Sequence, residues 1–199
     1  MLVALAALVA LAAPASSVRA AETGEPDLAW IDRALLEAGE VLVESRRTSR
    51  PRTVSVRVAT YVVAPPEAIF DVLTACEVAP EYVPNVQSCR SLETLADGRA
   101  ELFVQVVKPA FFIPRFEHVF RLDYTPYERI DVNRVSGPIE HMSGSWWLID
   151  EDDHVLLVYE LEIDPGMPVP RFFVRATLRR DLPRVIMAVR DRAEAAAPR

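Results

Sequence analysis

Apolar and polar residues alternate along much of this chain, which is the pattern of β-strands that bury one face. Residues 53–63 alternate between valines and mostly polar side chains. Residues 116–124 alternate in the same way and place one set of side chains on a single face: Phe116, His118, Phe120, Leu122 and Tyr124. Because an antiparallel sheet can face a core on one side and water on the other, both stretches predict antiparallel strands.

Further stretches with strand patterns follow one another through short turns: residues 85–95, 99–107, 129–135, 143–150 and 154–164. Residues 39–47 are expected to form a short strand ahead of the first long one. Gly98 lies in a tight turn, where a short hairpin needs a residue with positive φ. The first long strand and the six strands that follow it predict an antiparallel sheet of about seven strands.

Three short segments show helical features instead. Residues 27–37 carry apolar side chains three and four positions apart, which predicts a short N-terminal helix. Residues 64–76 contain two adjacent prolines near their start, where proline costs no hydrogen bond of the helix. Residues 76–84 are expected to form a second short helical turn, so two short helices follow the first long strand.

Residues 168–196 form a long amphipathic pattern, in which Pro183 is expected to kink the helix. The apolar stripe of this helix consists of Val174, Leu178, Leu182, Val185 and Val189. A long helix that follows a run of antiparallel strands packs on the apolar face of their sheet. The fold class is therefore predicted to be α+β.

The stretch KPAFFIPRF, residues 108–116, is unusual because hairpin tips are normally polar. In a run of antiparallel strands, every second turn lies at the same end of the sheet. The turns at 96–98, 125–128 and 150–153 would share a polar end, and the connections at 81–86, 108–115, 136–142 and 164–173 would share an apolar end. The apolar tip therefore belongs to an apolar rim.

The first residues are typical of a secretory signal peptide. An apolar run at residues 2–13 precedes Val18-Arg19-Ala20, which places small residues where signal peptidase cleaves. The run is too short to span a membrane. We expect a signal peptide at 1–20, an N-terminal segment at 21–38 and one domain at 39–195. The protein is then exported, to the periplasm, and it is membrane-anchored if the signal is uncleaved.

The charge of the chain disfavours nucleic acid as a partner. The formal net charge is −7, and removal of Arg19 with the signal peptide makes it −8, whereas phosphate binding needs a basic surface. Arginines nevertheless crowd the C-terminal segment from Arg171 to Arg192. They form either the solvated back of a helix or a contact with anionic lipids.

The search for catalytic and metal-binding motifs is negative. The chain has no Gly-x-Ser-x-Gly, no His-Glu-x-x-His and no glycine-rich phosphate loop, and its cysteines and histidines lack metal-ligand spacing. We therefore predict no metal, no cofactor and no catalytic residue. Cys76 and Cys89 form either a disulfide or two buried thiols, since spacing alone does not decide.

Two polar residues on strands are candidates for contact with a ligand. Alternation places His118 inward, where it is either a satisfied core residue or an acid–base group. Arg134 alternates with apolar residues on what is expected to be the inner face, where it would bind a carbonyl or carboxylate. A bulge near Gly137 would reverse the direction of Arg134.

Several motifs, taken in order, carry a resemblance to a known superfamily. They are VVAPPEAIFDVLT, EYVPNVQSCRSLE, GSWWLID, VYELEIDP and VPRFFVR, within residues 39–193. Together they resemble the START-like superfamily, also called SRPBCC, and within it the polyketide cyclase and coenzyme Q-binding branch. The resemblance implies a helix-grip fold, in which a curved antiparallel sheet wraps around the C-terminal helix. It also implies a hydrophobic cavity that binds lipids, isoprenoid quinones, sterols or polyketides.

This fold assigns places to the candidate residues. The cavity would be lined by Phe116, His118, Phe120, Arg134, Trp146, Leu148, Tyr159, Leu161, Leu178 and Leu182. The apolar rim would be the cavity mouth or a membrane contact, formed by Tyr82, Phe111, Phe112, Ile113, Met142, Met167 and Phe172. The tip at 111–113 is then either a lip over the mouth or a plug that folds back into the cavity.

Three hypotheses about function follow. The first is a non-enzymatic protein that binds a lipid or isoprenoid quinone and exchanges it at a membrane in the cell envelope. The second is an aromatase/cyclase-like enzyme acting on a polyketide-type chain through His118, Arg134 or Tyr159. The third is a module whose apolar tip docks a protein partner. The absence of a catalytic motif and the expected export favour the first hypothesis.

Overall fold

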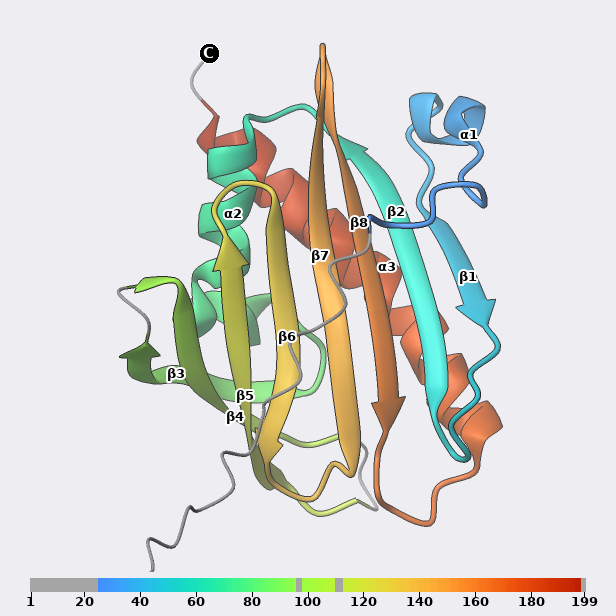
Figure 1. Cartoon of the computed structure of the whole chain (residues 1–199), viewed down its shortest axis with the longest axis vertical. Coiled ribbons are helices and arrows are strands. Elements are labelled where there is room, and N and C mark those ends of the chain that lie inside the picture. The colour runs from blue at the N-terminus through green and yellow to red at the C-terminus, as the bar shows by residue number, and fades with distance from the viewer. Residues whose placement is uncertain (1–24, 96–97, 110–112, 198–199) are drawn as a thin grey trace, which may run out of the picture.

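An antiparallel sheet curves around the C-terminal helix of this protein (Figure 1). The computed structural model describes residues 25–95, 98–109 and 113–197. The strands are β1 (Leu42–Arg46), β2 (Val54–Val62), β3 (Val86–Leu95), β4 (Ala100–Val107), β5 (Phe116–Thr125), β6 (Arg129–Ser136), β7 (His141–Glu151) and β8 (His154–Asp164). The helices are α1 (Arg33–Glu37), α2 (Pro66–Thr74), the 3-10 helix η1 (Cys76–Glu81) and α3 (Arg171–Ala196).

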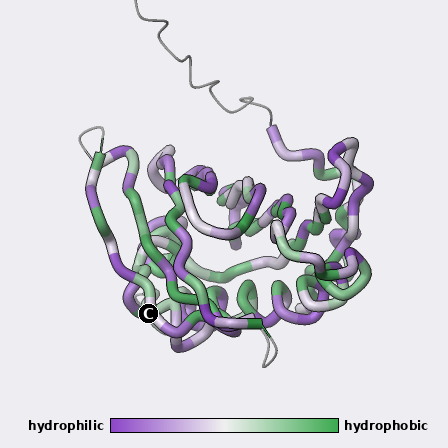
Figure 2. The backbone as a smooth tube through the Cα atoms, turned by 90° about the horizontal axis from the view of Figure 1, so that it is seen from below, coloured by the Kyte–Doolittle hydropathy of each residue, from purple (hydrophilic) through white to green (hydrophobic). Residues whose placement is uncertain are grey.

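The sheet has eight strands in the order β1-β2-β8-β7-β6-β5-β4-β3, and all neighbours are antiparallel. The predicted α+β helix-grip architecture is therefore confirmed. The sheet has one strand more than the expected seven, because Leu42–Arg46 forms a full ladder with β2, from Leu42 opposite Ala59 to Arg46 opposite Ser55. Hydrophobic and hydrophilic residues alternate along the strands (Figure 2).

The main core lies between the concave face of the sheet and the helices. Valines of β2, leucines of β8 and the apolar stripe of α3 form one buried cluster with Ile69 of α2. Leu182, Ile186 and Val189 of α3 are all buried, as the helical spacing predicts. The helix continues through Pro183, so the predicted apolar stripe remains in one element.

A second, smaller core covers the convex face of the sheet. Leu36 of α1 packs with Ala59 of β2 and with Leu156 and Val158 of β8. The helix predicted over 27–37 is confined to Arg33–Glu37, because aspartates before it hydrogen-bond the backbone locally. Asp27 accepts from the amide of Ala29 at 3.1 Å, and Asp32 caps the helix through the amide of Ala34.

The strand connections gather at two ends of the sheet. The β5–β6 and β7–β8 turns lie at the upper end in Figure 1, and the β6–β7 and β8–α3 connections lie at the lower end. A register shift at the lower end leaves Val135 without a partner, since Val119 pairs with Ser136 and Phe120 pairs with Arg134. This β-bulge lies at the end of β6 that leads into the β6–β7 connection.

Candidate functional site

Two adjoining chambers lie between the concave face of the sheet and the helices. The inner chamber has a volume of about 240 Å³ and is lined mainly by β4, β5, β7, β8, η1 and α3. The outer chamber has a volume of about 300 Å³ and extends towards the connections at the lower end of the sheet. Six residues line both chambers and mark their junction: Val83, Gln105, His118, Met142, Leu182 and Val185.

Aromatic side chains on paired strands form the walls of the inner chamber. Phe103 of β4 stacks on its register partner Phe120 of β5, with ring centroids 5.7 Å apart. Trp146 of β7 stacks on Tyr159 of β8, with centroids 3.9 Å apart and ring planes 9° apart. Gly144 makes room beside this pair, because a Cβ at that position would lie 3.3 Å from the Tyr159 ring and 2.5 Å from the Glu160 carbonyl oxygen. The chamber is therefore shaped by flat, apolar surfaces.

The outer chamber is lined by apolar residues from segments far apart in sequence. The β4–β5, β6–β7 and β8–α3 connections contribute Ile113, Ile139, Pro165, Met167 and Val169 to its wall. The first turn of α3 contributes Phe173 and Val174, while Phe172 points outward and is 71% exposed. The apolar rim predicted from the alternating turns thus forms one end of the cavity.

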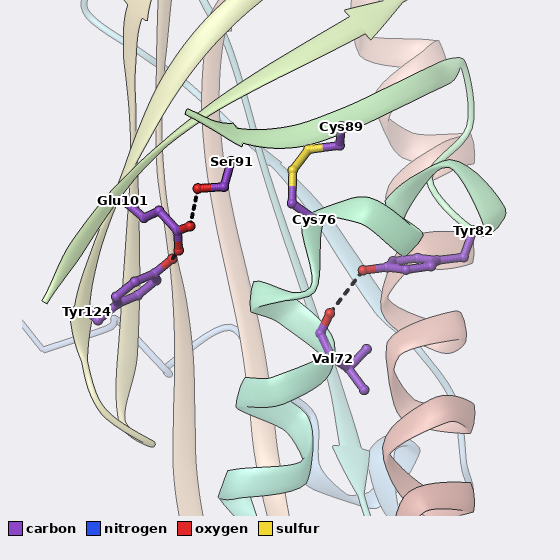
Figure 3. The surroundings of a disulfide bond; sticks show 7 residues. All are labelled: Val72, Cys76, Tyr82, Cys89, Ser91, Glu101 and Tyr124. Carbon is purple, nitrogen blue, oxygen red and sulfur yellow. Dashed lines mark hydrogen bonds between the residues drawn. A yellow bond between two sulfur atoms is a disulfide. The ribbon is translucent and has the colours of Figure 1, made fainter. Parts of the chain in front are cut away.

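The wall formed by η1 is held in place by three separate links, of which Figure 3 shows the first two. Cys76 of η1 and Cys89 of β3 form a disulfide, with Cα atoms 5.3 Å apart, which answers the question that their spacing left open. The hydroxyl of Tyr82 donates to the Val72 carbonyl of α2 at 3.2 Å. Arg192 of α3 lies over the Tyr82 ring, 4.6 Å from its centroid, and burial raises the pKa of this tyrosine.

His118 is the buried titratable residue at the junction of the chambers. Burial lowers its pKa to about 4, so that the imidazole is neutral near pH 7. Its Nδ1 atom is buried, and no residue in the described part of the chain hydrogen-bonds it. Gly137, at φ +112°, allows the β6–β7 connection to pass directly behind His118, because a Cβ there would lie 2.8 Å from the His118 Cα.

Most of the residues predicted to line the cavity are brought together there. Those that line one or both chambers are Phe116, His118, Phe120, Trp146, Tyr159, Leu161, Leu178 and Leu182. Leu148 lies outside the chambers, in the buried cluster that includes Ile69 of α2, because α2 closes over the sheet at this level.

Arg134 also lies outside the chambers, although it pairs with the inward-facing Phe120. Its guanidinium donates from Nη2 to the Gly137 carbonyl at 2.9 Å and from Nε to the Ile139 carbonyl. The β6–β7 connection thus satisfies the charged donors at the end of the strand, and the charge does not enter the apolar cavity. Arg134 holds the shape of this connection.

The predicted mouth residues separate into three groups. Ile113, Met142 and Met167 line the outer chamber, and Tyr82 and Met142 line the inner chamber. Phe172 is exposed on the first turn of α3. Phe111 and Phe112 lie outside the described residues, so the choice between a lip and a plug stays a prediction.

Sequence reasoning missed several polar residues of the cavity. Gln105 lines both chambers beside its register partner His118, and the alternation of residues 99–107 contained the signal for its direction. Asp181 and Thr177 of α3 line the outer chamber. Asp181 is buried and ion-paired with Arg180 at 2.7 Å, a position that the apolar stripe of the helix does not reveal.

The described residues hold neither a metal-binding cluster nor a membrane-spanning helix. Among the residues that the structure describes, no three His, Cys, Asp or Glu side chains gather closely enough to hold a metal ion. No helix in the described ranges is both long enough and apolar enough to cross a membrane.

Comparison with known families finds one match that covers most of the chain. Residues 62–190 match the family described as polyketide cyclase / dehydrase and lipid transport. No curated protein matches the sequence. The resemblance to the START-like superfamily that the ordered motifs indicated is thereby confirmed.

Several solved structures share the fold at low sequence identity. A STAR-related lipid transfer protein from Xanthomonas axonopodis is 17% identical over 76% of this chain and 92% of that chain, with a TM-score of 0.67. The ZhuI aromatase/cyclase from a Streptomyces species is 20% identical over 73% and 99%, with a TM-score of 0.62. Human StAR-related lipid transfer protein 5 is 16% identical over 78% and 82%, with a TM-score of 0.63. At these identities the likeness is one of fold.

Proposed function

Because the chain belongs to the polyketide cyclase / dehydrase and lipid transport family, we propose that it binds a lipid or isoprenoid quinone in its two chambers and transfers it without catalysing a reaction. One observation carries the proposal: two adjoining, mostly apolar chambers lie under a curved sheet and reach the apolar end of the fold. Sites for apolar molecules have this composition, with few polar groups in a concave apolar wall.

The physical need for such a carrier lies in the cost of exposing a long apolar molecule to water. Each methylene buried in the cavity contributes about 0.8 kcal/mol. The aromatic walls around Phe103, Phe120 and Trp146 offer large apolar contact areas for this purpose. A ligand that spans both chambers is held mainly by apolar contact, and few hydrogen bonds fix its orientation.

The titration behaviour of the cavity residues favours binding over acid–base catalysis. A general acid or base acts best when its pKa lies near the working pH. Burial holds the pKa of His118 at about 4, so the ring is a weak base at neutral pH. Burial raises the pKa of Tyr159 well above its ordinary value, so its hydroxyl is a weak acid. The proposal is therefore a carrier, and the cyclase-like alternative requires a base that the described cavity residues supply poorly.

The proposed place of action is the cell envelope, with contact at a membrane surface. Support comes from the signal-like residues 1–20 and from the surface around the start of α3. There Phe172 is exposed beside Arg171 and Arg175, at the end of the molecule where the outer chamber lies. Exposed aromatic rings insert at the lipid interface, and arginines attract anionic headgroups.

The first test of the proposal is native mass spectrometry of protein purified from its own envelope fraction, followed by lipid extraction. We expect a stoichiometric added mass that resolves to a lipid or quinone. The proposal is refuted if the protein is apo and also takes up neither lipids nor quinones in vitro. Turnover of a polyketide-type chain that His118→Ala abolishes, with binding retained, would instead establish the enzyme.

Membrane contact is tested separately by co-sedimentation with vesicles that contain phosphatidylglycerol. We expect Phe172→Ser to reduce vesicle binding several-fold, because an exposed ring no longer enters the interface. Leu92→Ser is the matched control, since Leu92 is also exposed but lies on β3. Equal binding of both variants and the wild type would show that this end does not contact lipid, and capture of one specific protein by the same surface would favour the docking module.

A further inference from the structure

His118 occupies the junction of the two chambers. It is 5% exposed and lines both of them. Its ring lies near Phe120, with centroids 5.5 Å apart, and near Phe116, with centroids 6.3 Å apart. The backbone of Gly137 packs directly behind it. The imidazole is thus fixed by apolar neighbours at the one level of the cavity that a ligand spanning both chambers must cross.

The ring lacks the hydrogen bonds that buried polar groups usually make. Nδ1 of His118 is buried without a partner, and no other residue that the structure describes hydrogen-bonds either ring nitrogen. Three further buried side-chain atoms lack a hydrogen bond in the described ranges: Trp30 Nε1, Ser45 Oγ and Glu160 Oε1, the last of which is ion-paired with Arg46 at 3.5 Å. None of these three residues lines either chamber. An unsatisfied buried group in a native protein calls for an explanation. Nε2 of His118 is the ring nitrogen that a ligand in the chambers can reach, because it has no partner among the described residues and is not one of these buried atoms.

Gln105 adds a second polar side chain at the same level. It is the register partner of His118 on β4 and also lines both chambers. Its amide makes no hydrogen bond with any residue in the described part of the chain. His118 and Gln105 therefore form a narrow polar band on one wall of the cavity, at the junction of two mostly apolar chambers.

We propose that the ligand carries a hydroxyl group between two apolar parts, and that this hydroxyl hydrogen-bonds to His118 in the polar band. The inference rests on the proposed function, because it names the class of molecule that the cavity takes. It excludes as preferred ligands those apolar molecules whose only polar group lies at one end.

The choice of a hydroxyl group follows from the hydrogen-bonding capacity of the His118 imidazole. A neutral imidazole offers one donor nitrogen and one acceptor nitrogen. A hydroxyl donates and accepts, so it satisfies His118 in either tautomer, and its remaining capacity suits the amide of Gln105.

The position within the ligand follows from the sizes of the chambers. Binding pockets for small molecules usually measure about 300 to 1,000 Å³. The inner chamber, at about 240 Å³, lies below that range, and the outer chamber, at about 300 Å³, lies at its lower limit. A ligand of ordinary size therefore occupies both chambers, and the part of it beside His118 is internal.

The test measures competition for a bound fluorescent apolar dye by three probes: 6-dodecanol, 1-dodecanol and dodecane. The full-length protein is used. We expect 6-dodecanol to bind wild type about three- to tenfold more tightly than 1-dodecanol, which is the net effect of one hydrogen bond made inside the cavity. In His118→Leu we expect this preference to disappear while all three probes still bind.

Two variants make the result specific. His154→Leu is the matched control, because His154 is ion-paired with Glu151 on the β7–β8 turn and lines neither chamber; it should keep the preference. Tyr159→Phe removes another hydrogen-bonding group of the inner chamber, the hydroxyl of the tyrosine that stacks on Trp146. Loss of the preference in Tyr159→Phe, with retention in His118→Leu, would overturn the assignment of the hydroxyl to His118.

The outcomes distinguish this inference from the proposed function. Equal binding of 6-dodecanol and 1-dodecanol to wild type would refute the internal hydroxyl but leave the carrier intact. If no probe and no extracted lipid competes with the dye, the carrier and the inference fail together. A His118→Leu protein that is folded by circular dichroism but retains the preference would also overturn the inference.

Discussion

Buried polar side chains have different surroundings on the two faces of the sheet. On the convex face Arg57 of β2 is 5% exposed, and on the concave face His118 of β5 is equally buried. Arg57 donates to Glu44 at 2.7 Å and to Asp27 at 3.1 Å, and its guanidinium lies over the Trp30 ring, 4.6 Å from the centroid. His118 has aromatic neighbours and a cavity in place of partners.

The two short helices on these faces differ in the same sense. On the convex face α1 packs through Leu36 into a filled core. On the concave face η1 covers a hollow, and a disulfide, a tyrosine hydroxyl and an arginine hold it. A face that only stabilises the fold is filled and satisfied, whereas a face kept open for a ligand lacks packing and needs other restraints.

Removal of the disulfide should have the largest effect on stability. The double variant Cys76→Ala with Cys89→Ala should lose about 3 kcal/mol, because the bond closes a short loop and so restricts the unfolded chain. Urea denaturation of oxidised and reduced protein measures the difference. Reduction should leave the double variant unchanged, and equal midpoints for oxidised and reduced wild type would contradict the prediction.

Removal of the Arg57 guanidinium should have the next largest effect on stability. Arg57→Met keeps an apolar stem but loses the charge-assisted hydrogen bonds to Glu44 and Asp27, so we expect a loss of about 2 kcal/mol. The control is Arg46→Met, since Arg46 makes a more exposed ion pair with Glu160 and should contribute about 0.5 kcal/mol or less. Thermal or urea unfolding that ranks Arg46→Met as the more damaging change would break the contrast between the faces.

The pH dependence of stability should report the environment of His118. Its pKa is about 4 in the folded protein and 6.5 in the unfolded chain. Below pH 6.5 the His118 side chain is protonated in the unfolded chain but stays neutral in the folded protein. The free energy of unfolding therefore falls by about 1.4 kcal/mol per pH unit, down to the folded pKa. Above pH 6.5 this contribution is constant.

The measurement compares wild type with His118→Leu by urea denaturation between about pH 7 and pH 5. Only wild type should carry this loss, since leucine binds no proton. The lowered pKa values of Asp27 and Glu151 act at more acidic pH and are common to both proteins. Parallel pH profiles would mean that His118 binds its proton equally well in both states.

The smallest effect is the gain in stability at neutral pH in the same variant. His118→Leu replaces an unsatisfied buried polar group by an apolar one, so we expect a gain of about 1 kcal/mol. The gain should accompany the loss of preference for the internal alcohol. A destabilised variant would show that His118 stabilises the fold as Arg57 does.

The sequence predicted the fold more completely than the cavity. Alternation around Val54 and Phe120 identified strands with one buried face, and the apolar stripe of α3 identified the helix that packs on them. These patterns are local, so they survive folding unchanged. The N-terminal helix was overestimated, because side chains such as Asp27 form competing local hydrogen bonds that periodicity does not include.

The sequence predicted which side chains point towards the concave face, but it did not predict which of them reach the cavity. The strand period placed His118 and Tyr159 on the inward face, and both line the inner chamber. It also placed Arg134 inward, since that residue pairs with Phe120. The arginine turns to the carbonyls of Gly137 and Ile139 instead, because only the folded β6–β7 connection brings those acceptors within reach.

The sequence by itself determined the elements, the apolar end of the sheet and the inward face that carries His118, because each follows from the short periods of strand and helix. Tertiary structure alone decided three features: the disulfide between Cys76 and Cys89, the division of the cavity into two chambers, and the absence of a described partner for His118 Nδ1. Each depends on distances between segments far apart along the chain, and those distances exist only after the sheet has curved around α3.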